Sequence, residues 1–139
     1  YSFKIKDINS LLLNLIKSYK NKFENSSETK VLIDSVIKNP NYIGGSDSLD
    51  STIMKISNKK IFCKGGAEGV FLFIDLKKEI GGVIKVADGN ERAIPYLIFS
   101  LFKKLKIMNS AELTNLKKIY SFKLLNHANL SVGSVETML

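Results

Sequence analysis

The sequence predicts a single α+β domain over residues 1–139, with an antiparallel sheet flanked by helices. Two observations lead to this fold class. Apolar residues recur at helical spacing toward both ends of the chain, whereas residues 59–87 show strand-like patterns separated by short turns. A hydrophobic content of 45% is typical of globular proteins, so a core can form.

The first part of the chain predicts a helical scaffold. Residues 7–23 place apolar side chains on one helical face, and Asp7 can cap the N-terminus of this helix. A second helix is expected over residues 27–38, and Asn39-Pro40 ends it.

A loop and a short helix follow. Residues 41–48, NYIGGSDS, contain a glycine pair that adopts conformations costly for other residues, so we expect a loop. Residues 49–57 predict a short helix with Asp50 or Ser51 as its cap. After this helix the apolar period changes from helical to strand-like.

Three runs predict an antiparallel meander. Residues 59–64 alternate between apolar and polar side chains, as in a strand. Residues 70–75, VFLFID, are nearly all apolar and predict a central strand covered on both faces. After a charged hairpin tip, residues 80–87 form the returning strand, in which Gly81-Gly82 indicates a bulge or a close backbone approach.

The last part of the chain predicts two helices and a strand. Residues 92–106 form an amphipathic helix that tolerates Pro95 in its first turn. Ser110 is expected to cap a helix over residues 111–119, and residues 131–135 are a candidate closing strand.

The composition narrows the class of protein. The net charge is +8, but the lysines occur in short pairs without a nucleic-acid-binding signature, which favours a solvated surface over a nucleic-acid partner. No apolar run approaches the roughly 20 residues of a membrane span, and no signal peptide is visible, so we expect a cytoplasmic protein without a membrane partner. One cysteine excludes an intramolecular disulfide and a zinc site built on several cysteines.

Lys64 is the first candidate for a catalytic residue. It is expected at a strand end, facing opposite Cys63, directly before Gly65-Gly66. A lysine held among apolar groups has a lowered pKa and can act as a base beside a serine. The glycines let a substrate lie against the strand edge and expose backbone N–H groups. The alternative is a surface lysine that enters a turn.

Other candidates are weaker. Glu68 and Asp88 are the carboxylates nearest the glycine turns; either one binds a substrate amine or caps a turn. Cys63 is interpreted as a small buried hydrophobe rather than a nucleophile. His127 is the only histidine and lies in a polar turn, so no Cys-His or Ser-His pair is supported.

The glycine-rich runs resemble one known family. CKGGAEGV at residues 63–70 resembles the AKGGAEGV-type segment of the bacterial L-asparaginase II family, and IGGVIKVADGNERA at residues 80–93 resembles its GIALKIEDGNxRA segment. DSTIM at residues 50–54 is similar to its D-T-x-x-M segment, and Asn126 with Val132-Gly133 is similar to its closing turn and strand. The likeness runs in order over nearly the whole chain.

This resemblance implies a fold related to serine β-lactamases and glutaminases, and hydrolysis of L-asparagine to L-aspartate and ammonia. Lys64 takes the place of the family lysine that partners a serine, as a general base or proton relay. We expect the substrate to be bound by residues of the two glycine-rich runs: Gly65, Gly66, Glu68, Asp88 and Asn90.

The resemblance covers only the C-terminal part of the family's chain, and the serine-bearing segments lie upstream of it. We therefore expect half of an enzyme, inactive alone; the alternative is an inactive remnant or interaction module with the same fold. A missing half would leave apolar faces of residues 70–75 uncovered, which predicts self-association or a complementary N-terminal half as partner. Asp50 matches a cysteine ligand of zinc-binding relatives but forms no site alone, so no cofactor is expected.

Overall fold

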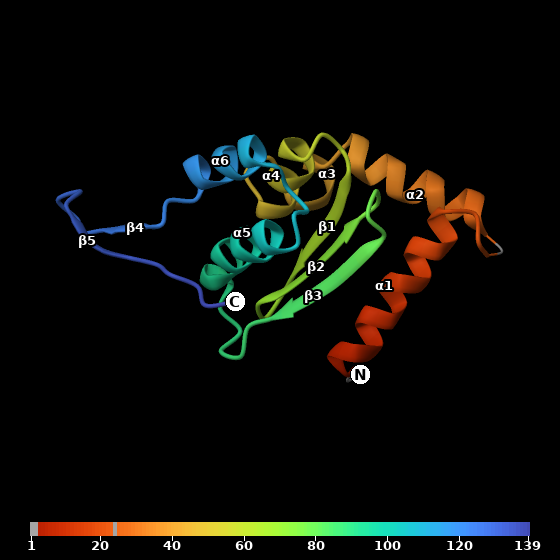
Figure 1. Cartoon of the computed structure of the whole chain (residues 1–139), viewed down its shortest axis with the longest axis horizontal. Helices are drawn as coiled ribbons and strands as arrows, with labels where there is room; N and C mark the ends of the chain where they lie inside the picture. The colour runs from red at the N-terminus through yellow and green to blue at the C-terminus, as the bar shows by residue number, and fades with distance from the viewer. Residues whose placement is uncertain (1–2, 24) are drawn as a thin grey trace. The chain divides into compact units, whose positions relative to one another are not determined.

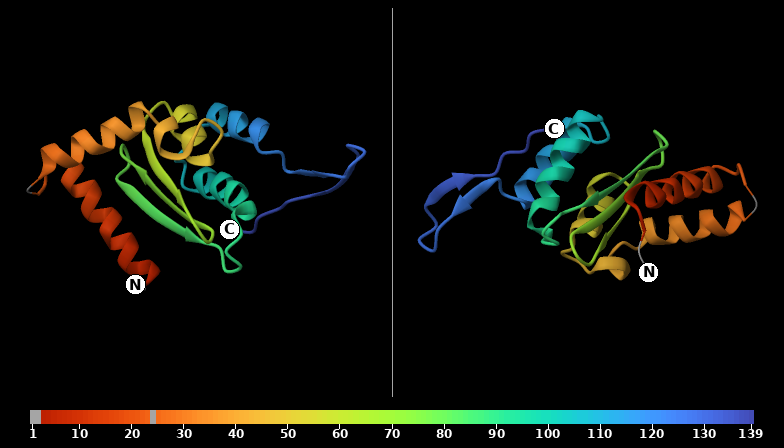
Figure 2. Two further views of the ribbon diagram at one scale, coloured as in Figure 1. Left: turned by 180° about the vertical axis from the view of Figure 1, so that it is seen from behind. Right: turned by 90° about the horizontal axis from the view of Figure 1, so that it is seen from below.

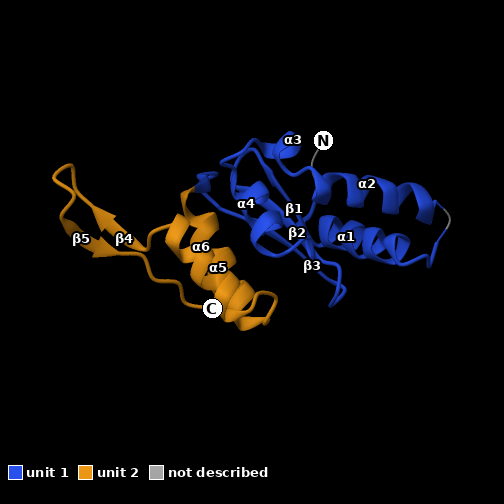
Figure 3. Ribbon diagram, turned by 90° about the horizontal axis from the view of Figure 1, so that it is seen from above, with its two compact units in different colours: residues 1–91 blue, residues 92–139 orange. Residues whose placement is uncertain are grey.

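The computed structural model describes residues 3–23 and 25–139. It divides into two compact units, Tyr1–Glu91 and Arg92–Leu139, which Figure 3 shows in blue and orange. An antiparallel sheet with helices around it confirms the predicted α+β class. A single domain over the whole chain stays a prediction.

The sheet of the first unit is a three-stranded meander, as predicted. Strands β1 (Ile61–Gly66), β2 (Val70–Asp75) and β3 (Ile80–Lys85) pair antiparallel in the order β1-β2-β3, with β2 in the centre (Figure 1). β1 begins two residues later than predicted because Asn58 and Lys59 have φ angles of 49° and 64°, which belong to a left-handed turn and not to a strand.

The sheet has no bulge at its glycine pair. β3 pairs with β2 without a register shift from Ile80 to Lys85, so close approach is the correct reading of Gly81-Gly82. A Cβ on Gly82 would overlap the ring of Phe73, its pairing partner on the neighbouring strand β2. A Cβ on Gly81 would lie 3.2 Å from the Leu12 Cβ. The two glycines therefore admit an aromatic ring on one face and a helix on the other.

That helix is α1 (Ile5–Tyr19), which packs along β3 and beside α2 (Ser26–Lys38), as Figure 1 and Figure 2 show. Both helices bury apolar side chains, at Leu12, Ile16, Ile33 and Ile37.

The ends of α1 differ from the prediction. The helix starts at Ile5, and the N-cap position is held by Lys4 without a side-chain hydrogen bond, so the expected cap by Asp7 is wrong. Asp7 lies in the first turn, where a carboxylate still faces the positive end of the helix dipole. The helix ends at Tyr19, because Asn21 adopts a left-handed φ of 60°, and does not reach residue 23.

The next helices also correct the expected boundaries. The loop at residues 41–48 contains a short helix, α3 (Asn41–Gly44). The following helix, α4 (Leu49–Ile56), is capped by Ser48, whose hydroxyl accepts a hydrogen bond from the Ser51 N–H at 3.2 Å. Neither Asp50 nor Ser51 is the cap. The carboxylate of Asp50 is thereby left for other contacts.

The central strand is covered. Its residues are all buried or half-buried, so the expected exposure of the faces of VFLFID is wrong. Exposed apolar side chains lie on α1 and α2 instead, among them Leu11, Val31 and Leu32.

The second unit begins within a 3-10 helix at Glu91–Ala93. It contains α5 (Ile94–Lys104), α6 (Ser110–Ile119) and a hairpin of β4 (Lys123–Leu125) and β5 (Ser131–Ser134). The expected helix over residues 92–106 is thus shorter. The predicted closing strand exists, but it pairs with β4 in a separate two-stranded sheet and does not extend the three-stranded one.

Helix α6 begins with a capping box. Asn109 accepts the N–H of Glu112 at 2.9 Å, and Glu112 accepts the N–H of Asn109 at 2.8 Å. Ser110 is therefore the first helical residue, not the cap. Over residues 3–23 and 25–139, no helix is both long and apolar enough to cross a bilayer.

Candidate active site

Lys64 lies on β1, a strand with only one neighbour in the sheet. Its side chain is 46% exposed, and its Nζ donates a hydrogen bond to the carbonyl oxygen of Gly65 and lies 3.6 Å from Asp50 Oδ2. Cys63 is fully buried, so the two neighbours face opposite ways, as the alternation predicts. The ammonium is thus partly in water and next to a carboxylate, rather than enclosed by apolar groups.

Asp50 is the buried partner of this lysine. It stands in the first turn of α4 and is 3% exposed. Its Oδ2 accepts the Gly65 N–H at 3.2 Å, and its Oδ1 accepts the Ser51 N–H at 3.0 Å. A Cβ on Gly44 would overlap the carboxylate, so the α3 segment packs closely against it. A single buried carboxylate therefore binds α4, β1 and the Lys64 ammonium.

The surroundings of Asp50 favour its ionised form. Burial by itself raises the pKa of this carboxyl group. The hydrogen bonds and the nearby ammonium act in the opposite direction and hold its pKa below the ordinary value; they come from Ser48, Gly65, Ser51 and Lys64. Asp50 is therefore a carboxylate at neutral pH, and its negative charge faces Lys64.

Cys63 is not a nucleophile of this site. Its sulfur lies 3.4 Å from the Asp50 carbonyl oxygen, in the core. Burial, and then the charge of Asp50, raise its pKa well above the ordinary value, so the thiolate does not form at neutral pH. The interpretation as a small buried hydrophobe is confirmed. His127 is exposed in the loop between β4 and β5.

The remaining predicted residues gather at the β1–β2 turn. Glu68 has a left-handed φ of 60° in this turn, and its carbonyl oxygen accepts the Lys85 ammonium at 2.6 Å. Gly89 packs against it, because a Cβ there would lie 2.8 Å from Glu68 Oε2. Asp88 accepts the Asn90 N–H at 2.9 Å. The Asp-Gly-Asn segment thus has the expected turn chemistry and lies beside the carboxylate of Glu68.

The structure therefore brings the candidates together at one end of the sheet in two groups. Lys64 with Gly65 and Asp50 forms one, at the free edge of β1. Glu68 with the Asp-Gly-Asn turn forms the other. Sequence reasoning missed the contact between Asp50 and Lys64; the only signal was the DSTIM segment, which gave no partner for its aspartate.

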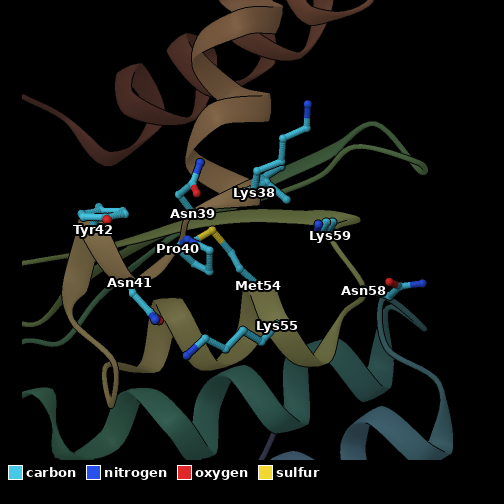
Figure 4. Close-up of a pocket in the computed structure, with 10 residues that line it drawn as sticks. Lys38, Asn39, Pro40, Asn41, Tyr42, Met54, Lys55, Asn58 and Lys59 are labelled. Atoms are coloured by element: carbon cyan, nitrogen blue, oxygen red, sulfur yellow. The ribbon is translucent and has the colours of Figure 1, made fainter.

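A cavity of about 390 Å³ lies elsewhere in the first unit, where α2, α3 and α4 meet. Pro40 and Met54 line its apolar part, and Figure 4 shows the Lys55 side chain extending toward Asn41 while Lys38 points away. Neither Lys64 nor the glycine pair lines it. Within residues 3–23 and 25–139, no cluster of three or more His, Cys, Asp or Glu side chains is arranged to hold a metal ion.

The fold and this site define an α+β protein whose candidate chemistry centres on a lysine at a glycine-containing strand edge. The sequence model of the L-asparaginase II family matches residues 1–137 of the chain. The chain therefore belongs to the L-asparaginase II family, which confirms the resemblance read from its glycine-rich runs. No curated protein matches the chain. Family membership supports a hydrolase function of the asparaginase type.

Proposed function

We propose that the chain is the C-terminal part of an L-asparaginase-type amidohydrolase, which converts L-asparagine and water to L-aspartate and ammonia. One structural observation supports this proposal in addition to family membership. Within the glycine-rich run that resembles a segment of the family, Lys64 presents a partly exposed ammonium at the free edge of β1, held in place by Asp50 and Gly65. A catalytic lysine needs both access to the substrate and a fixed position.

Lys64 serves as the proton relay of a Ser-Lys pair. A serine from a segment outside these 139 residues attacks the side-chain amide carbon of asparagine. The ammonium of Lys64 gives a proton to the amide nitrogen as the C–N bond breaks and ammonia departs. It takes the hydroxyl proton of the serine as the new C–O bond forms, so the lysine ends as an ammonium again. Water then hydrolyses the acyl-enzyme and restores the serine.

The glycine-rich runs bind the substrate. Gly65 and Gly66 lack side chains, so asparagine can lie against the strand; the Gly65 N–H itself already donates to Asp50. The carboxylates of Glu68 and Asp88 are suited to the α-ammonium group of the substrate, and Asn90 follows in the same turn.

No metal ion takes part in the proposed reaction. The oxygens of Asp50 already accept two backbone N–H groups, and a lysine ammonium lies 3.6 Å away. A zinc ion next to this ammonium would be repelled by it, so Asp50 does not suit the ligand position that it matches in zinc-binding relatives.

Ammonia release from L-asparagine tests this function. The chain alone is expected to give none; when mixed with the N-terminal segment of a family member, it gives ammonia, and Lys64→Ala abolishes the release. The matched control is Lys77→Ala, an exposed lysine in the β2–β3 turn, which leaves the rate unchanged. Release that survives Lys64→Ala, or no release from the completed protein, refutes the proposal. L-Glutamine, tested in parallel, establishes the preference between the two amides.

A second candidate is an interaction module with the same fold and no activity. The apolar side chains of Leu11, Val31 and Leu32 favour it, since each is more than half exposed, with fractions of 61%, 67% and 61%. The completed-protein assay separates the two candidates, because an interaction module binds the N-terminal segment without releasing ammonia.

A further inference from the structure

We infer that Asp50 is a positioning residue for Lys64, which fixes the lysine head group at the free edge of β1 for proton transfer. This inference rests on the proposed function for the role of Lys64. It assigns to Asp50 a task distinct from capping α4, which Ser48 performs.

The geometry supports this assignment because one carboxylate oxygen serves two adjacent residues. Asp50 Oδ2 accepts the Gly65 N–H at 3.2 Å and lies 3.6 Å from Lys64 Nζ. The lysine also donates to the Gly65 carbonyl oxygen. The side chain of Lys64 is therefore turned back toward the strand edge, and the backbone of the next residue is held by the same carboxylate.

The carboxylate itself is rigidly mounted. Ser51, directly after it, is fully buried and donates its hydroxyl to the Pro40 carbonyl oxygen at 2.8 Å. The Cys63 sulfur lies against the Asp50 carbonyl oxygen at 3.4 Å, and Gly44 leaves no space beside the carboxylate. Asp50 is thus fixed by α3, α4 and β1 together, and a fixed anion restricts the cation that pairs with it.

Because Asp50 is already fixed, the pairing of the two charges restricts the position of Lys64 only. An exposed lysine normally samples many rotamers in water. A buried carboxylate, however, is costly unless hydrogen bonds and a cation compensate its charge. Two titratable groups that the structure places next to Asp50 are the neutral Cys63 thiol and the Lys64 ammonium. Lys64 therefore supplies the compensating charge, and departure from the strand edge is disfavoured.

Lysine reactivity in the 139-residue chain tests the inference without requiring turnover. Trace acetylation with acetic anhydride, followed by mass spectrometry, gives a rate for each lysine. We expect Lys64 to react more slowly than the exposed Lys77, and Asp50→Asn to raise the Lys64 rate several-fold while Lys77 stays unchanged. The matched control is Asp47→Asn, an exposed aspartate close by in sequence, which leaves the Lys64 rate unaltered.

A measurement on the unsubstituted chain covers the case in which Asp50→Asn does not fold. In ¹³C NMR relaxation measurements, the Cε atom of Lys64 should show more restricted motion than the Cε atom of Lys77. Equal mobility of the two lysines, or an unchanged Lys64 acetylation rate in a folded Asp50→Asn variant, overturns the inference. Neither result depends on ammonia release, so the proposed function can fail while the coupling of Asp50 to Lys64 stands.

Turnover by the completed enzyme separates positioning from a structural role. We expect Asp50→Asn to lower kcat on the order of tenfold or more, with little change in KM, because misplacement of a reacting group slows the chemical step. Asp50→Glu retains the charge and should restore part of kcat. If Asp50→Asn leaves kcat unchanged in an enzyme that depends on Lys64, Asp50 has no positioning role although the proposed function stands.

Discussion

At the scale of single residues, the ionisation of Asp50 links stability to pH. Its folded pKa is depressed, so the carboxylate contributes stability that is complete above the unfolded pKa of about 3.9 and is lost as the pH falls through the folded pKa. We expect the free energy of unfolding to fall more steeply in the original chain than in Asp50→Asn between about pH 5 and pH 2. Urea titrations at several pH values measure this, and parallel curves contradict it.

The glycine pair of β3 gives a second prediction at this scale. Gly82→Ala forces a Cβ into the Phe73 ring, so we expect a loss of about 1–3 kcal/mol in the free energy of unfolding. Gly66→Ala is the matched control, because the nearest atom to its Cβ would be Val70 Cβ at an ordinary 3.5 Å. Chemical denaturation compares the two, and equal losses would show that ring packing is not the cause.

Residue-level reasoning from sequence placed residues correctly on strands and turns where the cause was local, whereas the catalytic role of Lys64 stays a prediction. Lys64 before a glycine pair and the Asp-Gly-Asn turn could be recognised because neighbouring residues define them. The pairing of Asp50 with Lys64 joins a helix to a strand, and no periodicity relates the two positions. Such a contact depends on how α4 packs on β1, which a linear pattern does not encode.

At the scale of elements, two substitutions distinguish Asn109 from Ser110 as the N-cap of α6. Asn109→Ala removes the side-chain acceptor for the Glu112 N–H, so we expect a loss of about 1 kcal/mol in the free energy of unfolding. Ser110→Ala, at the position that sequence reasoning chose, should cost distinctly less. Thermal unfolding followed by circular dichroism measures both, and a larger effect at Ser110 would restore the original assignment.

Elements were predicted best where burial defines them. The bounds of β2 match the apolar run of residues 70–75, since a central strand needs apolar side chains throughout. Helix ends were predicted less well, because left-handed residues such as Asn21 decide them. The hairpin of β4 and β5 is exposed along its length and carries no apolar alternation, so its pairing could not be read from the sequence.

At the scale of the whole molecule, the apolar surface of α1 and α2 predicts association. We expect the isolated chain to self-associate or to pair with a complementary N-terminal half, because exposed Val31 and Leu32 lose contact with water on binding. Sedimentation velocity measures this. Val31→Lys with Leu32→Lys should shift the chain toward monomer, whereas Leu124→Lys on β4 is the control. A monomer at all concentrations contradicts the prediction.

The burial of Cys63 gives the chain an internal reporter of local opening. The sequence has this one cysteine, and it sits fully buried in β1 with a raised pKa. A thiol reagent therefore reacts only when β1 separates from its neighbours, so the labelling rate measures how often the candidate site loses its shape. Labelling should slow when a ligand such as L-asparagine or a complementary half binds, and the amount of slowing gives the energy of that binding.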